Sequence, residues 1–343
     1  MNSGSELKDI TVIGGGPTGL FALFYAGMRG ISARLVDNLP ELGGQLVALY
    51  PEKDIFDMAG FPRVLSKDLA RGFVEQALQF DHEIRLGEQV DELIRQEDGP
   101  FILTTDKGSY PTKTVLIAAG KGSFSPRKLK VPGFEEFRDK GIYSHVKDPE
   151  GLRGKRVLIV GGGDSAFDWA WNLCGLASEL TLIHRSDRYR AHAKTVSDVR
   201  DAAERGELQL LPFHEVRAME GDGRIERVRI FHNKSSVERV LEVDSVLALI
   251  GFVPKLGAIA DWGLELEGNT IVVDSTMRTT VTGVYAAGDI ANYEGKLELI
   301  VNGAAEAAIA VNNAVHFVDP TQKVNPGHST HAAVFREKQT SPD

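Results

Sequence analysis

The segment "DITVIGGGPTGL" (residues 9–20) joins a short apolar run to a glycine cluster and then to a segment with helical apolar spacing. The apolar run is typical of a buried β-strand, and the spacing after the cluster is that of one helix face. Gly14, Gly16 and Gly19 complete a G-x-G-x-x-G pattern. In this pattern the first glycine turns the chain, the second lets the backbone approach a pyrophosphate, and the third allows the helix to pack on the strand. We therefore predict a dinucleotide-binding unit at the start of the chain.

An acidic residue ends the next predicted strand, "ARLVD" (33–37), and lies 23 residues after Gly14. At this position in a dinucleotide-binding unit, a carboxylate accepts hydrogen bonds from the hydroxyls of a ribose. Asp37 therefore predicts that the first unit binds a dinucleotide with an unphosphorylated ribose.

A second copy of the scheme occurs in "RVLIVGGGDSAF" (156–167), where Gly161, Gly163 and Ala166 form the G-x-G-x-x-A variant. His184 lies 23 residues after Gly161, and Arg185 and Arg190 accompany it. A carboxylate there would repel a 2′-phosphate, whereas guanidinium groups bind phosphate oxygens through charge-assisted hydrogen bonds. The second unit is therefore predicted to bind NADPH, with His184 as a contact that adds no charge when its imidazole is neutral.

Two dinucleotide sites in one chain are best explained by FAD in the first and NADPH in the second, because hydride can pass from nicotinamide to flavin. The predicted fold is α/β, with two Rossmann-like three-layer dinucleotide-binding domains and the second inserted into the first. "KTVLIAAG" (113–120) ends the first part, and "TTVTGVYAAGDIANY" (279–293) returns to it. The predicted parts are 1–122 (FAD-binding), 123–248 (NADPH-binding), 249–323 (FAD-binding, second part) and 324–343 (a C-terminal extension over the flavin).

Composition narrows the function classes. The net charge of −9 argues against nonspecific nucleic-acid binding, and the single cysteine excludes a disulfide, a CxxC redox pair or a thiolate-rich metal site within one chain. We find no metal-ligand cluster and no triad or acid–base pair, and hydride transfer needs none. The N-terminal segment lacks the features of a signal peptide, and no apolar run reaches the ~18 residues that span a bilayer. A cytoplasmic protein without membrane contact is expected.

The motifs "GGGPTG", "ELGGQL", "LIAAG", "GGGDSA", "HRSDRYR" and "VYAAGDI" span most of the chain. Together they resemble the low-molecular-weight pyridine-nucleotide:disulfide oxidoreductases, with the layout of thioredoxin reductase. Where that enzyme carries its redox CxxC, this chain has "GIYSHVKDPEGLRGK". The departure, with "GGQLVALYPEKDIFDMAGFP" and "VNPGHSTHAAVF", is similar to the thioredoxin-reductase-like ferredoxin–NADP(+) reductases. The resemblance implies FAD, NADPH, a homodimer, and ferredoxin or flavodoxin as partner.

The same resemblance implies individual site residues. Tyr50 stacks on one face of the isoalloxazine, while His328, with Thr330 nearby, covers the other face in the partner subunit's site. Asp289 binds ribityl or pyrophosphate-linked hydroxyls, and a helix starting near Leu297 directs its N-terminus at the flavin. The FAD contacts implied in full are Thr18, Asp37, Gln45, Tyr50, Val90, Phe124, Asp289 and Thr330.

The sequence leaves the electron acceptor open. Besides ferredoxin or flavodoxin, the acceptor can be a quinone, a dye or a separate disulfide protein, and a flavin-binding sensor without turnover is the alternative from another class. One pointer is the basic segment "GKGSFSPRKLK" (120–130), with Lys121, Arg127, Lys128 and Lys130. Such a patch would steer an acidic ferredoxin, although a solvated loop has the same composition.

Overall fold

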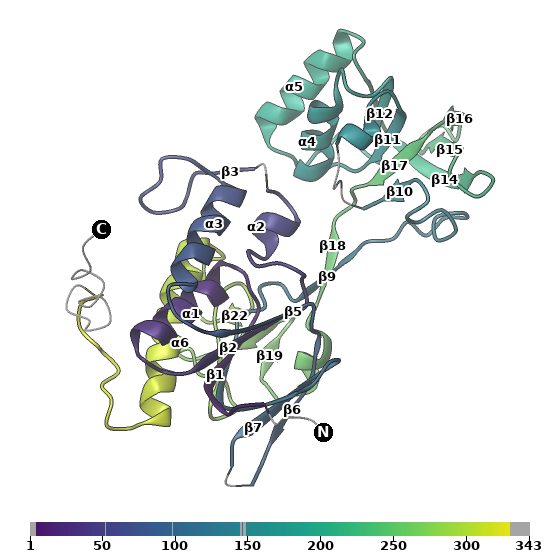
Figure 1. Ribbon diagram of the computed structural model, residues 1–343. Helices are drawn as coiled ribbons and strands as arrows, with labels where there is room; N and C mark the ends of the chain where they lie inside the picture. The colour runs from purple at the N-terminus through teal and green to yellow at the C-terminus, as the bar shows by residue number, and fades with distance from the viewer. Residues whose placement is uncertain (1–4, 52, 98, 145, 147–148, 330–343) are drawn as a thin grey trace. The chain divides into compact units, whose positions relative to one another are not determined.

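The structure is a computed structural model that describes residues 5–51, 53–97, 99–144, 146 and 149–329. The chain forms two compact units: the first runs up to Phe124 and resumes at Pro254, and the second spans Ser125–Val253. The chain leaves the first unit within β9 (Ser123–Pro126) and returns within β18 (Phe252–Lys255), and these two strands pair with each other. In Figure 1 the second unit is the teal-to-green part of the ribbon.

The first unit is built on a seven-stranded sheet in the order β5-β2-β1-β8-β7-β6, with β21 paired to β8. The parallel strands are β1 (Lys8–Ile13), β2 (Ala33–Asp37), β5 (Glu83–Leu86), β8 (Ser109–Ile117) and β21 (Val284–Ala286). The antiparallel extension consists of β7 (Phe101–Thr105) and β6 (Val90–Arg95). β21 follows the second unit in sequence, so the sheet of the first unit includes a strand from the part of the chain that comes after the second unit.

Helices cover this sheet, and α1 contacts both α3 and α6 (Figure 1). The helices of the first unit are α1 (Pro17–Met28), α2 (Gln45–Ala48), α3 (Ser66–Ala77), α6 (Ile300–Val318) and the short 3₁₀ helix η2 (Gly257–Asp261). Its remaining strands are β3 (Asp54–Ile55), β4 (Val64–Leu65), β19 (Leu266–Glu267), β20 (Thr270–Val272) and β22 (Ala291–Asn292). The helix expected near Leu297 begins at Ile300.

Helix α1 shows why the opening segment folds as the sequence predicts. Its i, i+3, i+4, i+7 residues Leu20, Leu23, Phe24 and Gly27 are all buried. A Cβ at Gly27 would lie 2.2 Å from the ring of Phe80, so this helical glycine makes room for an aromatic side chain.

The second unit has a five-stranded parallel sheet in the order β10-β17-β11-β12-β13 and a separate three-stranded antiparallel sheet. The parallel strands are β10 (Ile142–Tyr143), β11 (Arg156–Val160), β12 (Glu179–His184), β13 (Gln209–Pro212) and β17 (Ser245–Ala248). The antiparallel strands are β14 (His214–Glu220), β15 (Arg227–His232) and β16 (Glu238–Glu242). The helices are α4 (Asp164–Leu173), α5 (Ala193–Glu204) and the 3₁₀ helix η1 (Glu150–Leu152).

Alternation along β11 divides the core of the second unit into two clusters. Val157 and Ile159 belong to a cluster with residues of α4 and α5, whereas Leu158 and Val160 belong to one with residues of β14 and β15. Successive strand residues point to opposite faces, so the apolar run Val157 to Val160 fits the middle layer of three. The α/β architecture with two parallel-sheet units confirms the predicted fold class. Across the part of the chain that the structure describes, no helix combines the length and the apolar character that crossing a membrane requires.

Candidate functional site

The first glycine-rich loop connects β1 to α1. Gly14 has φ +109°, and a Cβ there would lie 2.4 Å from the Ala118 carbonyl oxygen; a Cβ at Gly19 would lie 1.9 Å from that of Gly14. Gly16 is the N-cap of α1, with Pro17 following it, and within the described chain no side chain caps this helix end. The first-turn N–H groups are therefore left for a ligand such as a pyrophosphate, and the glycines keep its approach clear.

Asp37 ends β2 and lies against this loop. Its carboxylate accepts hydrogen bonds from the N–H of Gly15 and, at 2.8 Å, from that of Leu39, and the residue is only 8% exposed. Burial raises the pKa of Asp37, and the backbone N–H groups of Leu39, Gly15 and Asn38 oppose that rise. Each carboxylate oxygen has a second lone pair, so the group keeps acceptor capacity for a ribose.

The segment "ELGGQL" closes over the same loop. The Gly43 N–H donates to the Gly15 carbonyl at 2.8 Å, and a Cβ at Gly44, which has φ +58°, would lie 2.7 Å from Gly16 Cα. Gln45 follows as the first residue of α2, and its Nε2 lies 3.0 Å from where a Cβ of Gly120 would be. Three segments distant in sequence therefore meet at the carboxyl end of β1, where ligands of doubly wound sheets bind.

Two further predicted FAD residues, Tyr50 and Asp289, interact electrostatically. Tyr50 is partly buried, and burial together with the Asp289 carboxylate raises its pKa. Asp289 follows β21, and its own pKa is raised by burial and by the carboxylates of Glu298 and Glu306. An aromatic ring beside a partly buried acid fits a ligand that has both a flat ring system and hydroxyl groups.

Thr18, in the first turn of α1, lies where three segments meet. A Cβ at Gly288 would come within 2.8 Å of Thr18 Oγ1, and one at Gly303 in α6 would come within 2.3 Å. The N-terminus of α6 also lacks a side-chain cap among the described residues. The starts of α1 and α6 and the turn after β21 thus pack against one another within the first unit.

The other predicted residues of the first unit are less informative. Val90 is buried as the first residue of β6, two residues after Glu88, whose N–H donates to the Asp37 carbonyl at 2.9 Å. Phe124 is in β9. His328 is exposed in the segment after α6, and Thr330 is outside the described residues.

The second glycine-rich loop, between β11 and α4, repeats the first. A Cβ at Gly161 would lie 2.3 Å from the Leu249 carbonyl oxygen and 2.7 Å from the Cβ of Ala166, which is fully buried. Gly163 is the N-cap of α4, and a Cβ there would have no neighbour within 4 Å among the described residues. This open N-terminus again suits a pyrophosphate.

His184 ends β12, and its imidazole packs under the loop. A Cβ at Gly162 would be 2.3 Å from His184 Cε1, and the ring centroids of His184 and Tyr189 are 5.6 Å apart. Burial, and the charges of Arg185 and Arg190, lower the pKa of His184. The neutral imidazole is therefore packed under the loop, while the two arginines are exposed. The Arg190 N–H donates to the Gly162 carbonyl at 2.8 Å, which ties the basic segment to the glycine loop.

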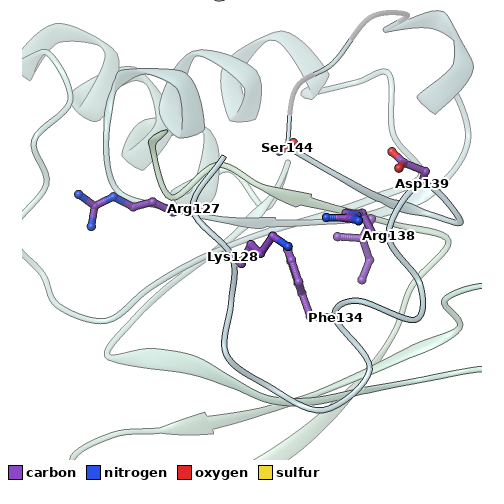
Figure 2. Close-up of a pocket in the computed structure, with 7 residues that line it drawn as sticks. Arg127, Lys128, Phe134, Arg138, Asp139 and Ser144 are labelled. Atoms are coloured by element: carbon purple, nitrogen blue, oxygen red, sulfur yellow. The ribbon is translucent and has the colours of Figure 1, made fainter. Parts of the chain in front are cut away.

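Two of the four basic residues in segment 120–130, Lys121 and Lys128, form ion pairs with acids. Lys121 forms an ion pair with Glu298 in the first unit. In the second unit a pocket of about 240 Å³ is lined by Arg127, Lys128, Phe134, Arg138, Asp139, Ile142 and Ser144 (Figure 2). Lys128 and Arg138 both pair with Glu135, at 2.8 and 3.2 Å. The predicted patch is therefore partly neutralised and divided between the two units.

Sequence reasoning missed a buried group in the first unit. Glu306 of α6 is 2% exposed and binds Gly288, Tyr293 and Lys296. The available signal was the single acidic residue of a helix rich in apolar residues, since acidic residues are almost never fully buried without a partner.

Known proteins share this architecture. The pyridine nucleotide-disulphide oxidoreductase family matches residues 8–307. The thioredoxin reductase of T. acidophilum superimposes with a TM-score of 0.75 at 27% identity, covering 91% of this chain and 98% of that one. The chain therefore belongs to the pyridine nucleotide-disulphide oxidoreductase family.

Two curated relatives show which members of this family the chain is similar to. The ferredoxin–NADP reductase of Thermus thermophilus is 52% identical over 329 residues, which cover 96% of this chain and 98% of the relative. Ferredoxin–NADP reductase 2 of Shouchella clausii is 46% identical over 331 residues, covering 96% and 99%. Within the family, the chain groups with the proteins named ferredoxin–NADP reductase.

Proposed function

We propose that this chain is a ferredoxin–NADP reductase, an FAD flavoenzyme that exchanges electrons between NADPH and ferredoxin. The observation that carries the proposal is the pair of glycine-rich loops with opposite charges at their strand ends, Asp37 in one and Arg185 with Arg190 in the other. FAD, when bound, takes a hydride from NADPH and passes electrons on singly or in pairs. The near-full-length identity to proteins of that name supports the same reaction here.

The first unit holds FAD. The open N-terminus of α1 receives the pyrophosphate, and Asp37 accepts from the adenosine ribose. Asp289 binds hydroxyls of the chain between the flavin and the pyrophosphate, and Tyr50, beside it, stacks on the ring system. Thr18, Gln45, Val90 and Phe124 complete the contacts.

The second unit holds NADPH. The N-terminus of α4 receives its pyrophosphate, and Arg185 and Arg190 bind the 2′-phosphate. His184 supports the loop from beneath, because its neutral ring packs against Gly162 and adds no charge.

The acceptor is ferredoxin, with flavodoxin as a second carrier of the same kind. The single cysteine removes a thiol–disulfide relay within one chain, so electrons leave the flavin without a protein disulfide. In the second unit, the basic residues that line the pocket contribute positive charge for an acidic carrier. The cytoplasmic location expected from the sequence stays a prediction.

We further propose a homodimer in which the C-terminal extension, with His328 and Thr330, covers the partner's flavin. Removing residues 324–343 should leave a folded protein with its FAD, because Val324 to Ser329 are exposed and contribute little to the core. The rates with ferredoxin or oxygen should change. Loss of folding after the deletion would show that the extension is structural.

The decisive experiment has two stages. Rapid mixing with NADPH should bleach the flavin absorbance, and repeated turnover should follow only with a suitable acceptor. Rates measured side by side with ferredoxin, flavodoxin and a quinone identify that acceptor. Bleaching without turnover on any of them would indicate a sensor, and a preference for the quinone would reject ferredoxin.

A further inference from the structure

A buried ion pair lies beside the turn that carries Asp289. Lys296 Nζ donates to both carboxylate oxygens of Glu306, at 2.5 and 2.6 Å, and the two side chains are only 8% and 3% exposed. Tyr293 donates its hydroxyl to the same carboxylate at 2.7 Å, and the burial and this hydrogen bond raise the Tyr293 pKa to about 12. Replacing such a pair with apolar residues is often neutral or stabilising, so stability alone is a weak reason for its presence.

Glu306 also holds the backbone of the turn. The Gly288 N–H donates to Glu306 Oε2 at 2.8 Å. Gly288 has φ +80°, and Thr18 lies where a side chain at that position would be. This N–H belongs to the Ala287–Gly288 peptide, so the Glu306 carboxylate fixes the backbone immediately before Asp289.

The charges of Lys296 and Glu306 both affect the pKa of Asp289. Burial raises the pKa of Asp289, Lys121 and Lys296 lower it, and Glu298 and Glu306 raise it. Lys121 and Glu298 are 33% and 55% exposed, so solvent screens that pair, whereas the Lys296–Glu306 pair is shielded from water. Loss of one partner of the buried pair therefore leaves a net charge that the surroundings screen poorly.

We propose that Glu306 and Lys296 are positioning residues for FAD, and that the cancellation of their charges sets the flavin's reduction potential. The inference rests on the proposal that FAD binds in the first unit. Glu306 orients the Ala287–Gly288 peptide, next to Asp289, and Lys296 neutralises the Glu306 carboxylate. Neither residue reacts.

The proposal predicts shifts of opposite sign. Reduction adds negative charge to the flavin, so an uncompensated ammonium stabilises the reduced form and an uncompensated carboxylate destabilises it. Glu306→Gln should shift the midpoint potential in the positive direction, and Lys296→Met in the negative direction. The double variant Lys296→Met/Glu306→Gln, which lacks both charges, should return close to the wild-type value.

Two variants serve as controls. Glu298→Gln makes the same chemical change in the exposed pair and should produce a much smaller shift than Glu306→Gln. Tyr293→Phe removes a hydrogen bond to Glu306 without changing a charge, and it should leave the midpoint potential near that of the wild type. All proteins are compared as purified holoenzymes, by dye-equilibrated reductive titration of the flavin absorbance and by the FAD content.

The outcomes are distinct. Opposite shifts that cancel in the double variant support the proposal, whereas shifts of one sign, or no shift, overturn it. If both single variants lose FAD, the double variant decides: a wild-type potential supports charge cancellation, and a shifted potential overturns it. If both single variants and the double variant lose FAD while Tyr293→Phe keeps it, the ion pair has only a structural role and the proposal is overturned. A wild-type protein without FAD would instead reject the proposed function.

Discussion

The two glycine-rich loops have the same arrangement of strand, loop and helix, but they differ in the residue that packs against the middle glycine. In each loop the middle glycine packs against the last residue of the next strand: a Cβ at Gly15 would lie 2.9 Å from Asp37 Oδ2, and one at Gly162 would lie 2.3 Å from the His184 ring. Asp37 is a buried acid held by backbone N–H groups, whereas His184 is a neutral wedge beneath exposed arginines. In the proposed function, the buried Asp37 suits FAD, which stays bound to the protein. The exposed Arg185 and Arg190 suit NADPH, which binds and leaves.

The largest expected effect comes from breaking either loop at its first glycine. Gly14→Ala should destabilise the protein by about 3 kcal/mol and abolish FAD binding, because its φ is positive and the added Cβ meets the Ala118 carbonyl oxygen. Gly161→Ala should instead raise the KM for NADPH while FAD is retained. FAD content, thermal unfolding and KM are the measurements.

Gly72→Ala is the matched control for both loop variants. Gly72 is exposed in α3, and a Cβ there would meet no described atom within 4 Å, so the change should be neutral or stabilise by up to ~1 kcal/mol. If Gly161→Ala lost FAD as readily as Gly14→Ala, the assignment of separate ligands to the two loops would be wrong.

The second effect concerns the exposed cations. Arg185→Ala/Arg190→Ala should lower the ratio of kcat/KM for NADPH over NADH by one to several orders of magnitude, since each lost charge-assisted bond is worth roughly 1.5–3 kcal/mol. FAD content should not change. Lys194→Ala, which removes an exposed lysine paired with Asp198 on α5, is the control. An unaltered ratio would mean that the charge reversal between the loops has another cause.

A smaller effect is expected at Tyr50. Tyr50→Ala should raise the dissociation constant for FAD about tenfold or shift the flavin spectrum, because it removes a stacking partner worth roughly 0.5–1.5 kcal/mol beyond its buried area. Tyr50→Phe keeps the ring and should behave like wild type. Equilibrium FAD titration and the visible spectrum test this, and wild-type values for Tyr50→Ala would remove the residue from the site.

The smallest effect concerns an ion pair at the start of β11. Arg156 donates to Asp244 from its backbone N–H and its guanidinium, both at 2.9 Å, and these bonds hold the Asp244 pKa below its usual value. A depressed pKa gives stability that is present above the unfolded pKa of about 3.9 and is lost as the pH falls through the folded value. Both side chains are 34% exposed, so Asp244→Asn should cost no more than ~1 kcal/mol at neutral pH.

Denaturant unfolding of wild type and Asp244→Asn at pH 7 and pH 3 checks this sign. The difference in unfolding free energy should shrink at the lower pH. A difference that grew with acidification would contradict the assigned pKa direction. Glu242→Gln, whose carboxylate is 58% exposed and 3.8 Å from Arg156, is the control.

Much of the site could be predicted because it is local in sequence. Gly14, Gly19 and Asp37 are linked by one strand, one turn and one helix, and the same holds for Gly161, Ala166 and His184. The role of His184 was harder to predict, because its packing under Gly162 depends on how the two strand ends meet. The start of α6 was placed only approximately, since the segment before Ile300 carries no capping side chain that would mark the boundary.

The sequence by itself determined the two dinucleotide units, the α/β class and the reversal of charge between Asp37 and Arg185. Each of these depends on residues within one β–loop–α–β segment, where local geometry leaves few choices. Only the tertiary structure decided that β21 pairs with β8, that the Asp289 charge acts on Tyr50, and that Glu306 binds both Lys296 and the Gly288 N–H. These contacts join segments that the sequence pattern treats independently, and which of them come together depends on packing over the whole unit.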